Sequence, residues 1–166
     1  MDKQEIYALL RDRGLWHEVT EHPAVFNMAE MAQVQLPYPQ ADAKNMLVRD
    51  DKKRSYYLLT VRGDKRVDLK AFRARYGTRM LSFASPQDLW ELLQLTPGSV
   101  SPLGLLSDTQ HRVQLYLDAE LLGGCGLIGV HPNDNTATVW LRTAELIELL
   151  RHQGSTVVVA EFAPQE

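Results

Sequence analysis

The sequence predicts an α+β fold: a single domain over residues 1–166, with a mixed, largely antiparallel sheet that curls toward a pseudo-barrel and is flanked by helices. Three observations lead to this prediction. Hydrophobic residues make up 45% of the 166-residue chain, enough for one buried core, and no linker interrupts it. Helical periodicity and strand-like apolar runs are interspersed along the chain. Two of these runs flank a short polar segment, which indicates a hairpin rather than a doubly wound parallel sheet.

Two helices and a strand are predicted before Pro37. Residues 3–13 place apolar side chains at helical spacing, and residues 16–20 have the composition of a short strand. Asn27 and Glu30 form a capping pair for a second helix, because the side chain of each can accept a hydrogen bond from the backbone amide of the other. That helix must end before Pro37, whose ring cannot continue it.

A basic hairpin and a short helix are predicted next. The segments 46–50 and 56–61 flank the polar sequence DKKRS, so they are expected to pair as strands with a basic tip. Residues 67–77 have the pattern of a short amphipathic helix, and residues 80–84 have that of a strand.

The second half of the chain predicts two helices and four strands. Ser85, Pro86 and Asp88 form an N-terminal signature for a helix that runs to about Leu95. Another helix is expected over residues 143–152. The four strands are predicted at residues 113–118, 124–130, 136–141 and 156–162.

The composition excludes several classes of protein. No apolar run is long enough to cross a membrane, and the charged N-terminal sequence is unlike a secretion signal, so a cytoplasmic protein is expected. The single cysteine, Cys125, leaves no internal disulfide or cysteine metal cluster, and its apolar surroundings predict a buried strand residue. The histidines lack metal-binding spacing, and no serine-hydrolase elbow, Walker loop or dinucleotide-binding motif occurs. No metal or cofactor is expected.

The net charge of −3 conceals a strong segregation of charge. From Lys44 to Arg79 there are twelve Lys or Arg residues and only four acids, so this basic segment has a charge of +8 and the remainder −11. A positive stripe on an acidic body is typical of a surface that binds a polyanion. The alternative is a solvated hairpin and helix whose cations pair with acids elsewhere in the fold.

Residues 96–105, TPGSVSPLGL, form a candidate ligand-binding loop. Its two prolines fix the backbone and its two glycines allow unusual conformations, so the loop is expected to hold a defined shape. The amides of Ser99, Val100 and Ser101 could then face a ligand. The alternative is an ordinary rigid connection after a helix.

Two more segments supply candidate site residues. Lys44 and Asn45 place a cation and an amide at the start of the first hairpin strand, and the turn GVHPNDNTAT presents His131 between two strands. Each has an ordinary alternative: a surface lysine beside a turn asparagine, and a simple hairpin connection.

Four segments, considered in the order in which they occur in the sequence, together resemble a known protein family. They are PQADAKNMLVRDDKKRSYYLLTVRGDKRVDLK, LSFASP, TPGSVSPLGLL and HPNDNTATV. Together they resemble the YbaK/prolyl-tRNA-synthetase-associated domain family and its free-standing prolyl-tRNA editing branch, from His22 to the last helix. The resemblance implies a YbaK-like fold and a trans-editing deacylase that hydrolyses the ester of mischarged proline tRNA, foremost alanine on that tRNA. A second, hydrolytic site of this kind is needed because the amino-acid pocket of a synthetase cannot strongly exclude an amino acid smaller than the correct one.

The mechanism that fits these residues is hydrolysis of an activated ester without a side-chain nucleophile, in which the resemblance suggests the role of the ribose 2′-hydroxyl. Amides of the loop Gly98–Pro102 would stabilise the oxyanion of the aminoacyl ester, because fixed dipoles need no reorganisation. Lys44 would anchor the 3′ end of the tRNA or orient the ester, and the ribose 2′-hydroxyl would help to position the attacking water. His131 and the walls around it would exclude proline by size. The implied partners are the acceptor end of mischarged tRNA and, for docking, prolyl-tRNA synthetase or an elongation factor.

The expected site residues fall into three groups. The catalytic group is Lys44, Gly98, Ser99, Val100 and Ser101. The substrate-binding group is Asn45, Pro102, Gly129, His131, Pro132, Asn135 and Thr136. The tRNA-binding group, from the basic segment, is Lys52, Lys53, Arg54, Lys65, Arg66 and Lys70. Departures from the family pattern are Asn27, where a threonine is expected, and Met46 and Val48 in the lysine strand.

Two other functions fit parts of the sequence. A non-catalytic tRNA-binding or nucleic-acid-binding module needs only the basic segment. A hydrolase of small aminoacyl esters needs only the loop. Loss of the basic side chains would affect the first function and spare the second.

Overall fold

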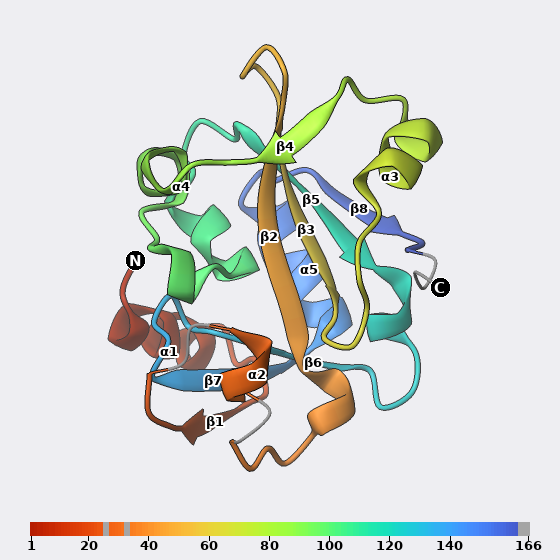
Figure 1. Cartoon of the computed structure of the whole chain (residues 1–166). Helices are drawn as coiled ribbons and strands as arrows, with labels where there is room; N and C mark the ends of the chain where they lie inside the picture. The colour runs from red at the N-terminus through yellow and green to blue at the C-terminus, as the bar shows by residue number, and fades with distance from the viewer. Residues whose placement is uncertain (25–26, 32–33, 163–166) are drawn as a thin grey trace.

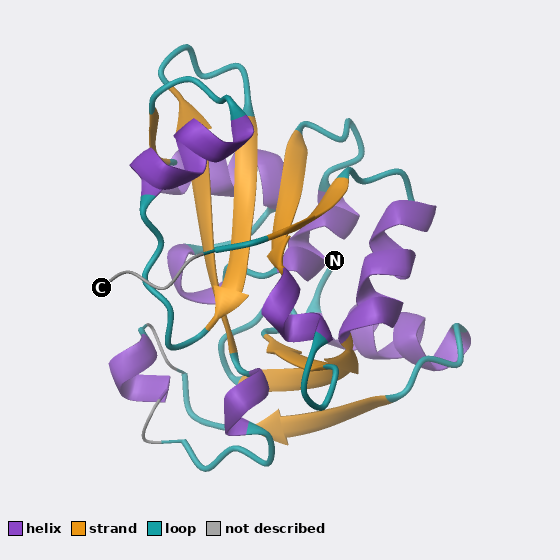
Figure 2. Cartoon of the chain, turned by 90° about the vertical axis from the view of Figure 1, so that its right-hand side faces the viewer, coloured by secondary structure: helices purple, strands orange, loops and turns teal. Residues whose placement is uncertain are grey.

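The structure, a computed structural model, contains two β-sheets whose strands run across each other (Figures 1 and 2). It describes residues 1–24, 27–31 and 34–162. The smaller, antiparallel sheet has the strand order β1 (His17–Glu21), β7 (Ala137–Arg142) and β6 (Leu127–Val130). The larger sheet has the order β4 (Leu81–Phe83), β2 (Ala43–Asp50), β3 (Tyr56–Arg62), β5 (Val113–Asp118) and β8 (Val157–Ala160).

Helices and short 3₁₀ segments surround these sheets (Figure 1). The α-helices are α1 (Lys3–Asp12), α2 (Met28–Met31), α3 (Leu69–Tyr76), α4 (Pro86–Leu93) and α5 (Thr143–His152). The 3₁₀ segments are η1 (Pro39–Ala41), η2 (Pro97–Ser99), η3 (Pro102–Ser107) and η4 (Ala119–Leu122). Within the larger sheet, β4, β2 and β3 are antiparallel, and β3, β5 and β8 are parallel. The predicted α+β class with a mixed sheet is therefore confirmed.

The larger sheet separates two clusters of buried apolar side chains. One cluster lies on the face covered by α3 and contains Tyr57, Val61 and Phe72. The other contains Leu58 and Leu115, together with residues of α1, α4, α5, η3 and the smaller sheet. Because side chains of a strand point alternately to the two faces, neighbouring residues of β2 contribute to different clusters.

Local sequence signals explain the helix ends. Ser85 and Asp88 form the reciprocal capping box at the start of α4. Asn27 accepts a hydrogen bond from the backbone amide three residues later, at the start of α2. Asp68 caps α3, and Gly77, with φ of 66°, ends that helix in the left-handed region that glycine adopts without strain.

The strands are divided between two sheets, which an isolated bridge from Asp42 to Gly129 links without closing a barrel. The sequence analysis did not predict the 3₁₀ segments. Cys125 is exposed and precedes β6, contrary to the prediction of a buried strand residue, because Gly124 and Gly126 adopt positive φ and form a turn around it. Among the described residues, no helix is both long and apolar enough to span a membrane.

Candidate functional site

The start of β2 presents Lys44 and Asn45 to opposite faces of the larger sheet. The Nζ of Lys44 donates a hydrogen bond of 3.1 Å to the carbonyl oxygen of Lys65. The Oδ1 of Asn45 accepts a hydrogen bond of 2.6 Å from the hydroxyl of Thr60, which lies directly opposite on β3. By strand alternation Asn45 shares a face with Leu47, whose cluster also receives Val100 from the candidate loop. Asn45, rather than Lys44, therefore shares the face on which the loop packs.

The candidate loop consists of η2 and η3, joined at Val100 and Ser101. The amide of Ser99 donates to the carbonyl oxygen of Thr96 at 2.9 Å, so the expectation that this amide is free for a ligand is wrong. The hydroxyl of Ser101 accepts from the amide of Leu103 at 3.2 Å and caps η3. Ser101 is fully buried, yet its own amide has no acceptor within the part of the chain that the structure describes.

This amide is the strongest local indication of a ligand in the loop. More than nine in ten buried backbone amides in proteins are hydrogen-bonded, because an unpaired one loses its interaction with water. Pro102 follows directly, is buried, and occupies the first turn of η3, where its missing amide costs nothing. The proline fixes the backbone beside the Ser101 amide without competing for the same acceptor.

The turn between β6 and β7 fixes the imidazole of His131. Its Nδ1–H donates to the carbonyl oxygen of Ala137 at 2.8 Å, which leaves Nε2 as an acceptor. Burial lowers the pKa of His131 below its usual value, and the nearby His22 lowers it further, against the opposing effects of the Ala137 carbonyl and Asp134. The histidine is therefore held as a neutral acceptor near neutral pH.

Gly129 is required at its position by close packing. A Cβ atom at this residue would overlap the ring of Trp140, so only glycine lets β6 approach that ring. Pro132, which follows His131, is also buried.

The remaining turn residues hold the turn itself. Thr136 donates its hydroxyl hydrogen to Asp134 and accepts from the Nζ of Lys3 at 3.0 Å. The side chain of Asn133 donates to the carbonyl oxygen of Leu103 at 3.5 Å, which places this turn beside the start of η3. The structure thus brings the loop and the histidine turn together, while the hydroxyl of Thr136, expected to bind substrate, is engaged within the turn. Asn135 lies between these residues in the same turn.

Sequence reasoning assigned no role to His22. Its Nδ1–H donates to the carbonyl oxygen of Pro23 at 2.9 Å, and its Nε2 accepts from the hydroxyl of Thr138 at 3.0 Å. The ring meets that of His131 edge-on, with 5.9 Å between centroids. Because the two histidines are 109 positions apart, only the pairing of β1 with β7 places them together. No group of three or more His, Cys, Asp or Glu side chains in the described ranges could hold a metal ion.

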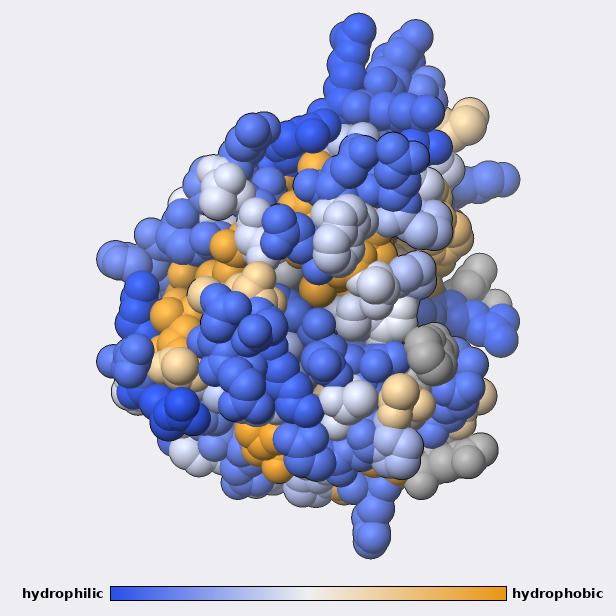
Figure 3. Space-filling model, turned by 90° about the vertical axis from the view of Figure 1, so that its left-hand side faces the viewer, coloured by the Kyte–Doolittle hydropathy of each residue, from blue (hydrophilic) through white to orange (hydrophobic). Residues whose placement is uncertain are grey.

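The basic segment divides into exposed and buried cations. Lys52, Lys53 and Arg54 are exposed at the tip of the β2–β3 hairpin, which projects from one end of the molecule (Figure 1). That end is hydrophilic in the space-filling view, and apolar side chains show on the flank below it (Figure 3). Arg66 and Lys70 are also exposed, next to and within α3.

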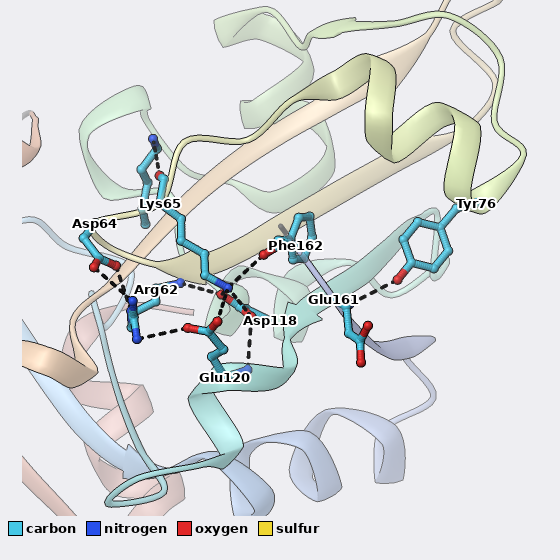
Figure 4. A network of polar contacts seen from close by, with 9 residues as sticks. Arg62, Asp64, Lys65, Tyr76, Asp118, Glu120, Glu161 and Phe162 are labelled. Atoms are coloured by element: carbon cyan, nitrogen blue, oxygen red, sulfur yellow. Dashed lines mark hydrogen bonds and ion pairs between the residues drawn. The ribbon is translucent and has the colours of Figure 1, made fainter. Parts of the chain in front are cut away.

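Lys65 is a correction to the predicted tRNA-binding group, because it is buried. Its side chain is 3% exposed and its Nζ lies 2.8 Å from a carboxylate oxygen of Asp118 and 3.2 Å from one of Glu120. The Nζ also donates to the carbonyl oxygen of Phe162 at 3.0 Å (Figure 4). With all its donors directed to oxygens inside the protein, this ammonium is not available to a phosphate.

Known proteins are similar to this chain over most of its length. The family model of the aminoacyl-tRNA editing domain matches residues 22–149. The prolyl-tRNA editing protein ProX of Acetoanaerobium sticklandii is 35% identical, over 96% of this chain and 97% of that protein. Prolyl-tRNA synthetase associated domain-containing protein 1 of Xenopus laevis is 32% identical, over 96% of each chain.

A solved structure supports the same fold. A crystal structure described as a candidate trans-editing enzyme for prolyl tRNA synthetase superposes with a TM-score of 0.69, at 24% identity, over 98% of this chain and 97% of that one. The residues that the family model matches include the lysine strand, the loop and the histidine turn. The chain therefore belongs to the aminoacyl-tRNA editing domain family.

Proposed function

We propose that this protein is a trans-editing aminoacyl-tRNA hydrolase that removes a wrongly attached amino acid, alanine above all, from proline tRNA. The relatives named for prolyl-tRNA editing and for association with prolyl-tRNA synthetase support the substrate class. The observation that carries the proposal is the buried amide of Ser101, which has no acceptor within the described chain and lies in a loop beside the histidine turn.

The proposed reaction is attack of water on the carbonyl carbon of the aminoacyl ester. The new C–O bond forms as the carbonyl oxygen gains negative charge. The carbonyl then re-forms as the bond to the ribose oxygen breaks, and that oxygen takes the proton that the attacking water loses. The amide of Ser101, which the entering ester must uncover, donates to the developing oxyanion, and the prolines around it hold its dipole in a fixed direction. The 2′-hydroxyl of the ribose positions the water, so the substrate supplies part of the catalysis.

Lys44 and Asn45 act on different parts of the substrate in this proposal. The ammonium of Lys44 uses one of its three donors on the carbonyl of Lys65, which leaves two for an oxygen of the tRNA 3′ end. Asn45 lies on the face of the sheet against which the loop packs, where its amide binds an oxygen of the ester or ribose. Gly98, Val100 and Pro102 shape the loop between them.

Selection against proline is assigned to the rigid turn. His131, Pro132 and Gly129 are fixed by a hydrogen bond, by burial and by contact with Trp140. Attraction for one methylene is worth only about 1–3 kcal/mol, so walls that exclude the larger proline must supply the rest of the selectivity.

Binding of the acceptor stem is assigned to exposed cations of the basic segment. Lys52, Lys53 and Arg54 form no ion pair among the described residues, so they can replace the counterions of a phosphate backbone. The same observation favours a second candidate function, a tRNA-binding module without catalysis, which would bind the same tRNA and leave its ester intact.

The test is release of amino acid from proline tRNA charged with alanine and, separately, with proline. We expect rapid release of alanine, slow release of proline, and near-background release by Lys44→Ala. Arg142→Ala, at an exposed residue beyond the site, is the matched control and is expected to behave like the unaltered protein. Binding of the charged tRNA without release would instead establish the binding module, and an undiminished rate in Lys44→Ala would remove Lys44 from the mechanism.

A further inference from the structure

A buried hydroxyl in the centre of the larger sheet contacts the candidate site. Thr60 is fully buried on β3, between β2 and β5, and the other residues of Tyr56–Val61 are apolar or aromatic. A hydroxyl in such a place destabilises the fold unless it is hydrogen-bonded. Its hydrogen-bond partner is the side chain of Asn45, at 2.6 Å directly across the strand pair.

This hydrogen bond determines which end of the Asn45 amide is exposed. The hydroxyl of Thr60 donates to Oδ1, and a separation of 2.6 Å is usual for an O–H···O bond but shorter than an ordinary bond from an amide nitrogen. With Oδ1 occupied, Nδ2 has two hydrogens to donate, and it has no acceptor in the described portion of the chain. An asparagine without such a partner could present either its oxygen or its nitrogen.

We propose that Thr60 is a positioning residue that holds the Asn45 amide with Nδ2 toward the substrate. This inference rests on the proposed function, in which Asn45 binds the aminoacyl end of the tRNA. A fixed pair of N–H donors suits an oxygen of the ester or ribose. It does not suit the α-ammonium group of the amino acid, because that group is itself a hydrogen-bond donor and needs an acceptor. The orientation therefore assigns Asn45 to the ester side of the substrate.

Two substitutions at Thr60 separate positioning from packing. Thr60→Val keeps the branched shape but removes the donor, whereas Thr60→Ser keeps the donor but removes a buried methyl group. We expect Thr60→Val to unfold no more easily than the unaltered protein while kcat for alanine release falls about 5- to 10-fold, the factor for one net hydrogen bond. We expect Thr60→Ser to have a lower Tm and a kcat within about twofold of the unaltered value.

This crossed result is the discriminating observation. If Thr60 only supported the fold, activity would follow stability, and the serine variant would be the less active of the two. A serine variant less active than the valine variant would therefore overturn the inference, as would a valine variant with unchanged kcat.

A second readout does not depend on activity. The side-chain amide signal of Asn45 in a ¹⁵N correlation spectrum is identified by its absence in Asn45→Ala. We expect this signal to move in Thr60→Val and to stay near its original position in Thr60→Ser. An unmoved signal in Thr60→Val would show that the hydroxyl does not orient the amide, and would overturn the inference.

Failure of the proposed function is distinguishable from failure of this inference. If Asn45→Ala loses alanine release but Thr60→Val does not, the proposed function stands and the positioning role falls. If Asn45→Ala retains full activity, Asn45 does not bind the substrate and the positioning role is excluded with it. If the unaltered protein releases no amino acid from any mischarged tRNA, the proposed function fails, and the amide signal alone decides whether Thr60 orients Asn45.

Discussion

The basic segment contains two regions with opposite surroundings: the hairpin tip and the turn after β3. At the tip, Lys52, Lys53 and Arg54 are exposed and have no ion pair among the described residues. In the turn, Lys65 is buried against Asp118, a carboxylate that is fully buried and 53 positions away in the sequence. The two kinds of cation look alike in the sequence because the acids that distinguish them lie far along the chain.

The alternative interpretation of the basic segment, that its cations pair with acids of the fold, therefore holds for some of its residues. Side-chain ion pairs are formed by Arg49, Arg62, Lys65, Arg75 and Arg79. Within the described chain, no ion pair is formed by the other seven cations, Lys44, Lys52, Lys53, Arg54, Arg66, Lys70 and Arg73. The charge of the first group is largely balanced by its own acidic partners, most of them at the surface, so the positive potential available to a polyanion comes mainly from the second group.

Replacing Lys65 is expected to change stability more than any substitution at the hairpin tip, and it tests whether the buried cation stabilises the fold. Lys65→Met leaves the carboxylate of Asp118 buried without its cation, and we expect the free energy of unfolding to fall by about 3–5 kcal/mol, measured by chemical denaturation. Lys65→Met combined with Asp118→Asn removes both charges and should recover most of that decrease. If Lys65→Met lowered the free energy of unfolding no more than Lys53→Ser does, the buried pair would not stabilise the fold.

A second buried acidic group, Asp42, extends the comparison because no described residue forms an ion pair with it. Burial raises the pKa of Asp42 to about 7, from an ordinary value of 3.8. The folded protein therefore keeps this proton at pH values where the unfolded chain has lost it. The resulting stabilisation is fully present below pH 3.8 and is lost as the pH rises through 7.

Replacement of Asp42 tests the direction of this pH dependence of stability. We expect Asp42→Asn to raise the Tm at pH 8, where the unaltered side chain is a buried carboxylate, and to leave it nearly unchanged at pH 4. Thermal unfolding at both pH values measures the difference. A Tm that falls equally at both would show that the carboxylate is satisfied by interactions other than a proton.

The smallest effect on stability is expected at the hairpin tip. Replacing Lys52, Lys53 and Arg54 together by serine should change the free energy of unfolding by no more than about 0.5 kcal/mol for each substitution. The same change should weaken tRNA binding and reduce the slope of log affinity against log salt by up to about 0.9 for each phosphate that the tip no longer neutralises. Arg11→Ser with Arg13→Ser, at the exposed end of α1, is the matched control. An unaltered salt slope in the tip variant would exclude the tip from the tRNA surface.

Much of the fold was predictable because its signals are local. The β2–β3 hairpin follows from two apolar runs around a polar tip, and α4 follows from the capping pair of Ser85 and Asp88. Local pattern could not reveal the burial of Lys65 or the contact of His22 with His131, because both depend on distant strands. Cys125 was placed wrongly because its apolar neighbours concealed a turn formed by glycines with positive φ.

Prediction of the candidate site was limited in the same way. The loop, the lysine strand and the histidine turn were identified as segments, and their roles remain proposals. Strand alternation alone puts Asn45 and Lys44 on different faces, but only the structure shows that the loop packs on the face of Asn45. The engagement of Ser99 and Thr136 in local hydrogen bonds also required the three-dimensional structure.

The β2–β3 hairpin has a consequence for the order of folding. Asn45 and Thr60 are only 15 positions apart, so their pairing closes a short loop, and hairpins of this kind form within about 1–10 μs. The parallel pairing of β3 with β5, and the ion pair of Lys65 with Asp118, must close a segment more than three times as long. The Asn45–Thr60 pair is therefore expected to be native-like in the folding transition state, with φ-values above those of residues in β5 and β8.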